Sequence, residues 1–93
     1  MLTLVAEIKV REGKVEEAKA AFRELMAAVT GSEPGTLTYT IHQHKDDPLL
    51  FLAYERYQDE GALKTHMTNL GKHGSRLAGL LDGRPKATYL VDI

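Results

Sequence analysis

The sequence predicts an α+β fold of the ferredoxin-like type, in which helices cover one face of an antiparallel sheet. Apolar residues alternate with period two in four segments and recur at helical spacing between them. Only residues 45–48 separate the two central strand segments, so we expect these strands to form an antiparallel hairpin. The resulting order, β-α-β-β-α-β, is that of the ferredoxin-like fold.

The first half of the chain is expected to contain a strand, a helix and a second strand. Residues 2–10 are aliphatic and β-branched, which is typical of a strand. From Lys14 the apolar residues follow helical spacing with charged residues opposite, and Gly31 is expected to end this helix. Residues 32–35, Ser-Glu-Pro-Gly, predict a turn. Residues 36–44 alternate strictly and predict the second strand.

The second half is expected to contain a strand, an interrupted helix and a last strand. Asp59 has the side chain and the position of a helix N-cap, and Gly71 and Gly74 interrupt the helical pattern that follows it. The expected segments are a strand at 49–58, a helix after Asp59, a shorter helical segment at 75–81, a turn at 82–85 and a strand at 86–93.

Length and composition limit the classes of protein to consider. A chain of 93 residues is expected to be one domain spanning residues 1–93, and the absence of cysteine excludes disulfides and thiolate metal sites. Twelve basic and thirteen acidic residues are mixed along the chain, which argues against a nucleic-acid partner. No apolar run approaches the roughly 20 residues of a membrane span, and the N-terminus lacks a signal-peptide pattern. The expectation is therefore a cytoplasmic protein with no membrane partner.

Both faces of the predicted sheet carry apolar residues. Leu4 and Ile8 alternate with Val5 in the first strand, and Leu52 alternates with Phe51 in the third. Helices can cover only one face, so the other needs a second partner. A second copy of the chain, packed sheet to sheet, is the simplest one, and we expect an obligate homodimer.

His66 lies on the apolar side of the second predicted helix, between Leu63, Met67 and Leu70. If the aliphatic sheet face forms the dimer, the more polar face looks toward His66 and is poorly suited to a dry core. We therefore expect a small-molecule cavity between helices and sheet. Its expected residues are Val5, Glu7, Thr38, Thr40, His42, Phe51, Glu55, Tyr57, His66 and Met67.

Structural interpretations of these residues stay open beside the functional one. A histidine on an apolar helix face is often a hydrogen-bonded core residue, and Glu7 and Glu55 could be solvated at strand edges. His42 and His44 share a strand face, but no third ligand accompanies them at a recognisable spacing. We therefore expect no metal site.

Residues 32–69 resemble the antibiotic biosynthesis monooxygenase (ABM) domain, including small quinol-monooxygenase-like proteins. Residues 5–18, VAEIKVREGKVEEA, are also similar, so the resemblance covers nearly the whole chain. The matching features are Glu33-Pro34-Gly35, Tyr39, His42, Asp47-Pro48, Phe51, Glu55, an aromatic residue at Tyr57, Asp59, Ala62-Leu63 and His66. The resemblance implies a dimeric α/β barrel built from two ferredoxin-like units.

The resemblance also implies an activity. Enzymes of this family oxidise quinol or phenolic aromatic small molecules with O2 and use no flavin, haem or metal, so no cofactor is expected. Deprotonation makes a phenol more reducing, and a histidine suits that proton transfer. The implied catalytic residues are His66, as proton acceptor or substrate orienter, and Glu7 or Glu55, which would fix its tautomer. The implied substrate-binding residues are Thr40, His42, Phe51, Tyr57 and Met67.

Three alternatives remain open. The protein could be a non-catalytic dimeric binder of small ligands. An isomerase acting on phosphorylated ketones is disfavoured, because such a substrate needs cationic groups and Arg56 alternates away from the expected cavity. Haem degradation is disfavoured because Glu7 stands where haem-degrading relatives carry Asn, and the chain contains no Trp.

Overall fold

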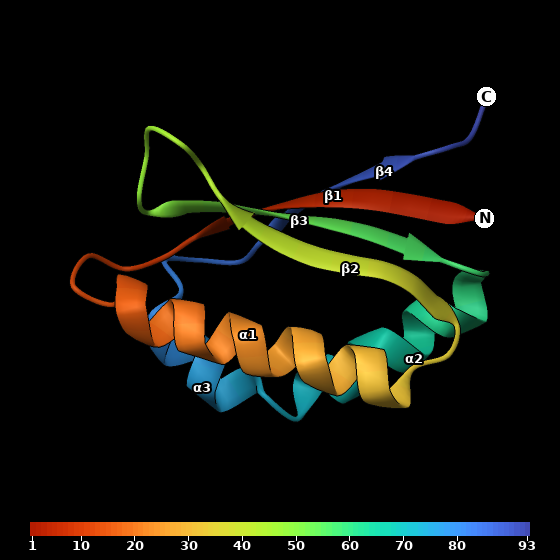
Figure 1. Cartoon of the computed structure of the whole chain (residues 1–93), viewed down its shortest axis with the longest axis horizontal. Coiled ribbons are helices and arrows are strands. Elements are labelled where there is room, and N and C mark those ends of the chain that lie inside the picture. The colour runs from red at the N-terminus through yellow and green to blue at the C-terminus, as the bar shows by residue number, and fades with distance from the viewer.

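The computed structural model describes all 93 residues, which form a four-stranded sheet with three helices on one face (Figure 1). The strand order is β2-β3-β1-β4, and every neighbouring pair is antiparallel. This confirms the predicted ferredoxin-like α+β fold. The elements are β1 (Leu2–Lys9), α1 (Val15–Ser32), β2 (Thr36–Gln43), β3 (Leu50–Tyr57), α2 (Glu60–Gly71), α3 (Gly74–Leu80) and β4 (Lys86–Leu90).

Two predicted boundaries are wrong. Gly31 does not end the first helix, because α1 continues through it to Ser32. An exposed glycine costs a helix only about 1 kcal/mol relative to alanine. The stronger signal is Pro34, which disfavours helical geometry at the residue before it, and Glu33 accordingly leaves the helix with φ −123° and ψ 83°. The last strand is also shorter than expected, because residues 91–93 are not part of β4.

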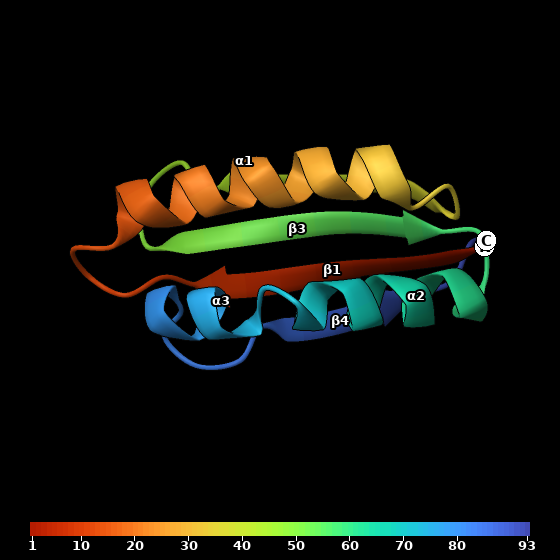
Figure 2. The same ribbon diagram turned by 90° about the horizontal axis from the view of Figure 1, so that it is seen from below.

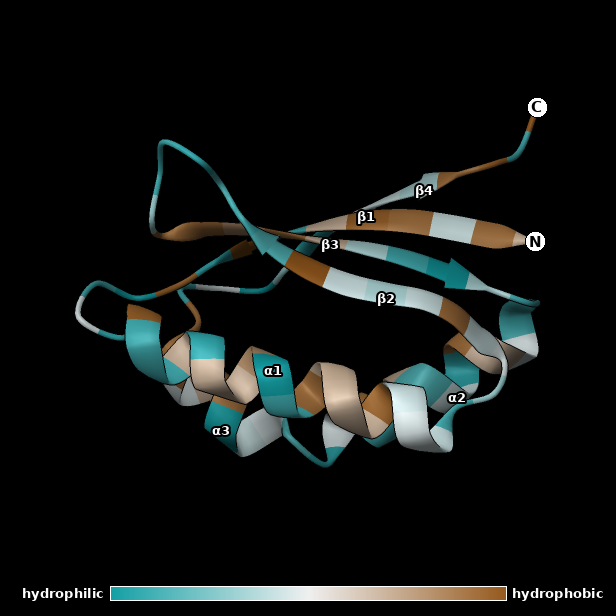
Figure 3. Cartoon of the chain, in the orientation of Figure 1, coloured by the Kyte–Doolittle hydropathy of each residue, from teal (hydrophilic) through white to brown (hydrophobic).

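The core lies between the sheet and the helices. Phe22 of α1 meets Phe51 of β3 edge to face, with ring centroids 5.2 Å apart. β1 is one of the most hydrophobic segments of the fold (Figure 3), and its Leu4, Ala6 and Ile8 are buried against the helices. Seen from the helix side, α1 covers one half of the sheet, and α2 with α3 covers the other (Figure 2). No helix is long and apolar enough to cross a membrane.

Local signals at the start of α2 bring it close to β2. The Asp59 carboxylate accepts a hydrogen bond from the Ala62 amide at 2.8 Å, which confirms the predicted N-cap. A Cβ atom on Gly35 would lie only 2.7 Å from the Ala62 Cβ, so a side chain at position 35 would clash with the helix. Gly35 therefore permits close packing of α2 beside the start of β2. Glu33 lies two residues earlier, next to this contact.

The strand register decides which residues face the helices. Directly paired residues of antiparallel strands share a face of the sheet. Leu4 pairs with Glu55 on the face toward the helices, whereas Glu7 pairs with Leu52 on the face away from them. We call the second face the outer face, and no helix covers it (Figure 1). Its residues are Thr3, Val5, Glu7, Lys9, Thr38, Thr40, His42, Leu50, Leu52, Tyr54, Arg56, Lys86, Thr88 and Leu90.

Candidate active site

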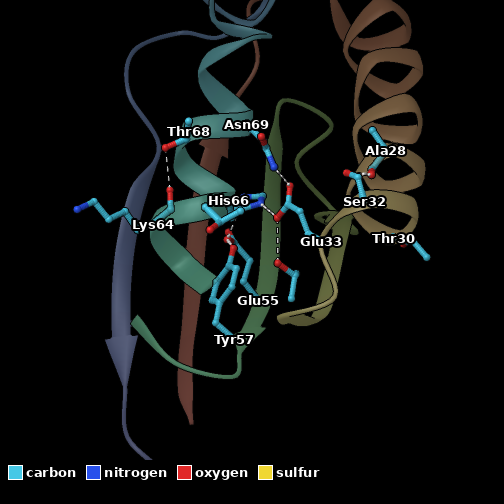
Figure 4. Close-up of polar contacts among 12 residues, drawn as sticks. Ala28, Thr30, Ser32, Glu33, Glu55, Tyr57, Lys64, His66, Thr68 and Asn69 are labelled. Carbon is cyan, nitrogen blue, oxygen red and sulfur yellow. Dashed lines mark hydrogen bonds and ion pairs between the residues drawn. The ribbon is translucent and has the colours of Figure 1, made fainter. Parts of the chain in front are cut away.

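His66 is the centre of a buried polar cluster between α2 and the sheet (Figure 4). Ala62, His66 and Leu70 recur every four residues, so they lie along the same side of α2. His66 is only 1% exposed. Its Nδ1 atom is 2.9 Å from Glu33 Oε1, and its Nε2 atom is 3.8 Å from Glu55 Oε1. The imidazole therefore lies between two buried carboxyl groups.

Glu33 reaches this cluster because it directly follows Ser32, the last residue of α1. Its carboxyl group accepts a hydrogen bond from the Thr36 hydroxyl at 2.9 Å and another from the Asn69 amide at 3.3 Å. A carboxylate that is ionised can only accept hydrogen bonds, and these two donors suit that state. The remaining contact, with His66 Nδ1, then requires the imidazole to carry its proton on Nδ1. This tautomer leaves Nε2 as a proton acceptor.

Glu55 lies on the Nε2 side of the imidazole and is held from β3. Tyr57, which is fully buried two residues along the same strand, donates its hydroxyl hydrogen bond to Glu55 Oε1. Burial raises the pKa of Glu55 above its ordinary value, although the Tyr57 hydrogen bond and the nearby His66 oppose the shift. The 3.8 Å gap to His66 Nε2 is too long for a direct hydrogen bond. A hydroxyl group of a ligand can therefore approach both groups.

Two tyrosine rings enclose the imidazole. The Tyr39 ring centroid lies 4.7 Å from that of His66, and the Tyr57 centroid lies 5.4 Å from it. Burial and the neighbouring Glu55 and Glu33 raise the pKa of Tyr39 well above the ordinary phenol range. Burial and the bond to Glu55 raise the pKa of Tyr57 in the same direction. Both phenols thus stay protonated near neutral pH, and the Tyr57 hydroxyl acts as a hydrogen-bond donor rather than a base.

A cavity of about 290 Å³ lies between the helices and the sheet and reaches this cluster. Its volume is close to the lower end of the range for small-molecule pockets, about 300 Å³. Apolar side chains form most of the wall, and His66, Glu55 and Tyr39 supply polar groups. The lining residues are Leu4, Ala6, Ile8, Phe22, Leu25, Tyr39, Ile41, Glu55, Leu63, His66, Met67, Leu70, Leu77, Leu81, Arg84, Pro85, Ala87 and Tyr89.

The structure separates the expected site residues into two groups on opposite faces of the sheet. Glu7, Thr40 and His42 lie on the outer face, where they pair with Leu52, Tyr54 and Leu52 respectively. The expectation that these three converge with His66 is therefore wrong. Thr38 and Val5, also expected at the cavity, lie on the outer face as well. Polarity does not identify the face toward the helices, because the register pairs polar Glu55 with aliphatic Leu4 on that face.

The other expected residues lie on the helix side of the sheet. Glu55, His66 and Met67 line the cavity, and Met67 is 56% exposed. Phe51 and Tyr57 do not line it: Phe51 packs on Phe22 in the core, and the buried Tyr57 is hydrogen-bonded to Glu55. They can support the wall of the cavity but do not present a surface to a ligand.

Glu33 and Tyr39 are site residues to which the sequence pattern assigns no role. Glu33 stands in a Glu-Pro-Gly turn, and Tyr39 alternates like an ordinary strand residue. Their presence among the features of the ABM resemblance is the one available signal. No group of three or more His, Cys, Asp or Glu side chains is arranged to hold a metal ion.

Comparison with known families decides the assignment. A family model described as antibiotic biosynthesis monooxygenase (ABM) matches residues 1–70. The chain belongs to this family. No curated protein sequence matches it.

Solved structures agree with the ABM assignment. PA3566 of Pseudomonas aeruginosa is 30% identical in sequence and matches with a TM-score of 0.82. The match covers 99% of this chain and 93% of the PA3566 chain. A candidate antibiotic biosynthesis monooxygenase of Caulobacter crescentus is 29% identical in sequence and matches with a TM-score of 0.90. The match covers 99% of this chain and 89% of the Caulobacter chain. A candidate antibiotic biosynthesis monooxygenase from Nitrosomonas europaea is 24% identical in sequence and shares the fold with a TM-score of 0.88. The match covers 100% of this chain and 99% of the Nitrosomonas chain.

Replacing Glu55 by glutamine is expected to change how stability depends on pH. Because the pKa of folded Glu55 is raised, its contribution to stability is fully present below its ordinary value of 4.5 and is lost as pH rises through the folded value. Glutamine can still accept the Tyr57 hydrogen bond and does not ionise. The melting temperature of Glu55→Gln, relative to the parent, should therefore rise as pH increases from below 4.5 toward neutrality.

Thermal unfolding followed by circular dichroism across this pH range measures the effect. Glu12→Gln is the matched control, because Glu12 is exposed in the turn after β1 and has no ion-pair partner. A constant difference in melting temperature between Glu55→Gln and the parent would contradict the role assigned to burial.

Proposed function

We propose that this ABM-family protein is a cofactor-independent monooxygenase that oxidises a phenolic or quinol-like aromatic small molecule with O2. The observation that carries the proposal is the position of His66 at the cavity, with Nδ1 held by Glu33 and Nε2 directed toward Glu55. Membership of the ABM family supports oxygenation as the reaction class.

The first step is removal of a proton from the substrate. A phenolic hydroxyl within hydrogen-bond distance of both His66 Nε2 and Glu55 would transfer its proton to Nε2, and Glu33 would stabilise the resulting imidazolium. We propose that Tyr39, which lines the cavity and whose raised pKa keeps it protonated, donates a hydrogen bond to the phenolate. Donors that are fixed before the reaction stabilise developing charge effectively in a buried site.

The second step is oxidation of the anion by O2. For an aromatic methylene that exchanges with a phenol tautomer, the balanced change is CH2 + O2 → C=O + H2O. The ring carbon supplies the electrons, one oxygen atom forms the new carbonyl and the other leaves as water. The wall of the cavity is mainly apolar, which suits binding of both the ring and O2.

Oxygen uptake tests the proposed function. The purified protein, pretreated with a chelator, is given a panel of hydroquinones, catechols and anthrones in an oxygen electrode. The proposal requires uptake that depends on both the protein and one of these substrates. Saturable binding of the aromatics with no uptake would instead identify a non-catalytic small-ligand binder, the main alternative.

We also propose that two copies pack through their outer faces as a homodimer. Val5, Leu52, Tyr54 and Leu90 form an apolar part of this face that no helix covers, and Tyr54 and Leu90 are among the exposed large hydrophobic residues. Uncovered apolar sheet surface of this kind is typical of an interface.

The dimer predicts a mass of about twice the 10.3 kDa of one chain. Light scattering or sedimentation at micromolar concentration should give that value for the parent and a value near one chain for Tyr54→Lys, because the lysine would bring a charge into the interface. Arg23→Gln, on the exposed side of α1, should remain dimeric. A monomeric parent would remove this proposal.

A further inference from the structure

The mouth of the cavity carries two arginines and no carboxylate. An open depression of about 450 Å³ adjoins the cavity, and Arg11 and Arg84 are the two charged residues among those that line it. The depression and the cavity adjoin, because they have six lining residues in common: Met67, Leu70, Leu77, Leu81, Arg84 and Pro85.

Local structure holds both arginines at this mouth. Arg11 donates a hydrogen bond from Nε to the Leu81 carbonyl at 2.9 Å, which leaves the two Nη groups of its guanidinium without a protein partner. Arg84 follows Gly83, which turns the chain with φ +86°, and precedes Pro85, which restricts the backbone of Arg84. Arg84 forms no ion pair and no side-chain hydrogen bond within the chain.

No carboxylate forms an ion pair with either arginine. Asp82 is in the same turn, but it makes no ion pair with either arginine and does not line the depression. Glu55 lines the inner cavity beside His66 and is not part of the depression. Guanidinium groups match the planar geometry of carboxylates and also bind phosphates, each through paired hydrogen bonds.

We infer that Arg84, assisted by Arg11, forms an anion subsite for a carboxylate or phosphate group carried by the substrate, whose aromatic ring occupies the apolar cavity. The inference rests on the proposed function and narrows its substrate class to aromatic compounds with an anionic substituent. The hydroxyl to be deprotonated would lie at the His66 end, and the anionic group at the mouth.

Binding of a matched set of ligands tests the subsite without turnover. The probes are 6-hydroxy-2-naphthoate, its neutral amide and the corresponding phosphate ester, each titrated against the protein by calorimetry under anaerobic conditions. The carboxylate should bind about 10-fold or more tightly than the amide, in line with hydrogen bonds between charged partners. Comparing the affinities of the carboxylate and the phosphate ester shows which anion the subsite prefers. Titration with free inorganic phosphate measures the affinity of the subsite for an anion that carries no aromatic ring.

Variants separate a local effect from general charge. Arg84→Gln should reduce the preference for the anion to within about 3-fold, and Arg84→Lys should restore part of it. Arg23→Gln removes the same charge from the exposed side of α1 and should keep the preference of the parent. Thermal unfolding of each variant shows whether it is folded. The preference should also weaken as salt concentration rises.

Two results would overturn the subsite: equal affinity of the parent for the amide and both anions, or an equal loss of the preference in Arg84→Gln and Arg23→Gln. Failure of the subsite is distinguishable from failure of the proposed function. Oxygen uptake with neutral phenols would preserve the function when the subsite fails. Tight binding of the anionic probes with no uptake from any aromatic substrate would support the subsite and reject the function.

Discussion

Replacing His66 by glutamine is expected to lower substrate-dependent oxygen uptake by about 10²–10⁴-fold, the usual contribution of a positioned acid or base group. Glutamine has a similar size, and its amide can donate the hydrogen bond that Glu33 accepts from Nδ1 in the parent. It has no basic nitrogen to place near Glu55. We therefore expect the fold to persist while proton transfer fails.

Two measurements on the same variant distinguish this role from a structural one. Oxygen uptake per folded protein reports catalysis, and thermal unfolding reports stability. His44→Gln is the matched control, because His44 is exposed in the turn between β2 and β3, and this variant is expected to leave uptake close to that of the parent. If His66→Gln kept normal uptake and only lowered the melting temperature, His66 would be a structural core residue.

Replacing Glu33 by glutamine is expected to lower turnover by a comparable factor, although Glu33 does not line the cavity. Loss of a carboxylate that orients a catalytic histidine costs about 10⁴-fold in the serine-protease case, where the wrong tautomer is the cause. A glutamine amide can donate to Nδ1 of His66, which would move the imidazole proton to Nε2. The nitrogen that faces Glu55 could then no longer accept a proton.

The imidazole nitrogen shifts of His66 in an NMR spectrum report this change directly. They should show the proton on Nδ1 in the parent and on Nε2 in Glu33→Gln, with the loss of turnover mainly in kcat rather than KM. Asn69→Ala is the control, because it removes one hydrogen bond to Glu33 but keeps the carboxylate. An unchanged tautomer together with normal kcat would show that Glu33 only stabilises the fold.

Local sequence signals were sufficient for the elements of this fold. Period-two alternation located the strands, and the same pattern correctly divided each strand into two faces, such as Leu4 and Ile8 against Val5. Asp59 marked the start of α2 because an N-cap depends on residues only three positions apart. The prediction that Gly31 ends the helix was wrong. Pro34 disfavours helical geometry at Glu33 more strongly than an exposed glycine disfavours a helix.

Tertiary structure alone decided how these faces and ends combine into a site. Alternation shows which residues of one strand share a face, but the register between strands depends on contacts distant in the sequence. That register put Glu55 toward the helices beside Leu4, and Glu7 and His42 on the outer face. Glu33 joins His66 across 33 positions only because α1 ends where Gly35 lets α2 pack closely. The sequence by itself therefore determined the elements and singled out His66 with Glu7 or Glu55, whereas long-range packing decided that Glu55 and Glu33, and not Glu7, surround His66.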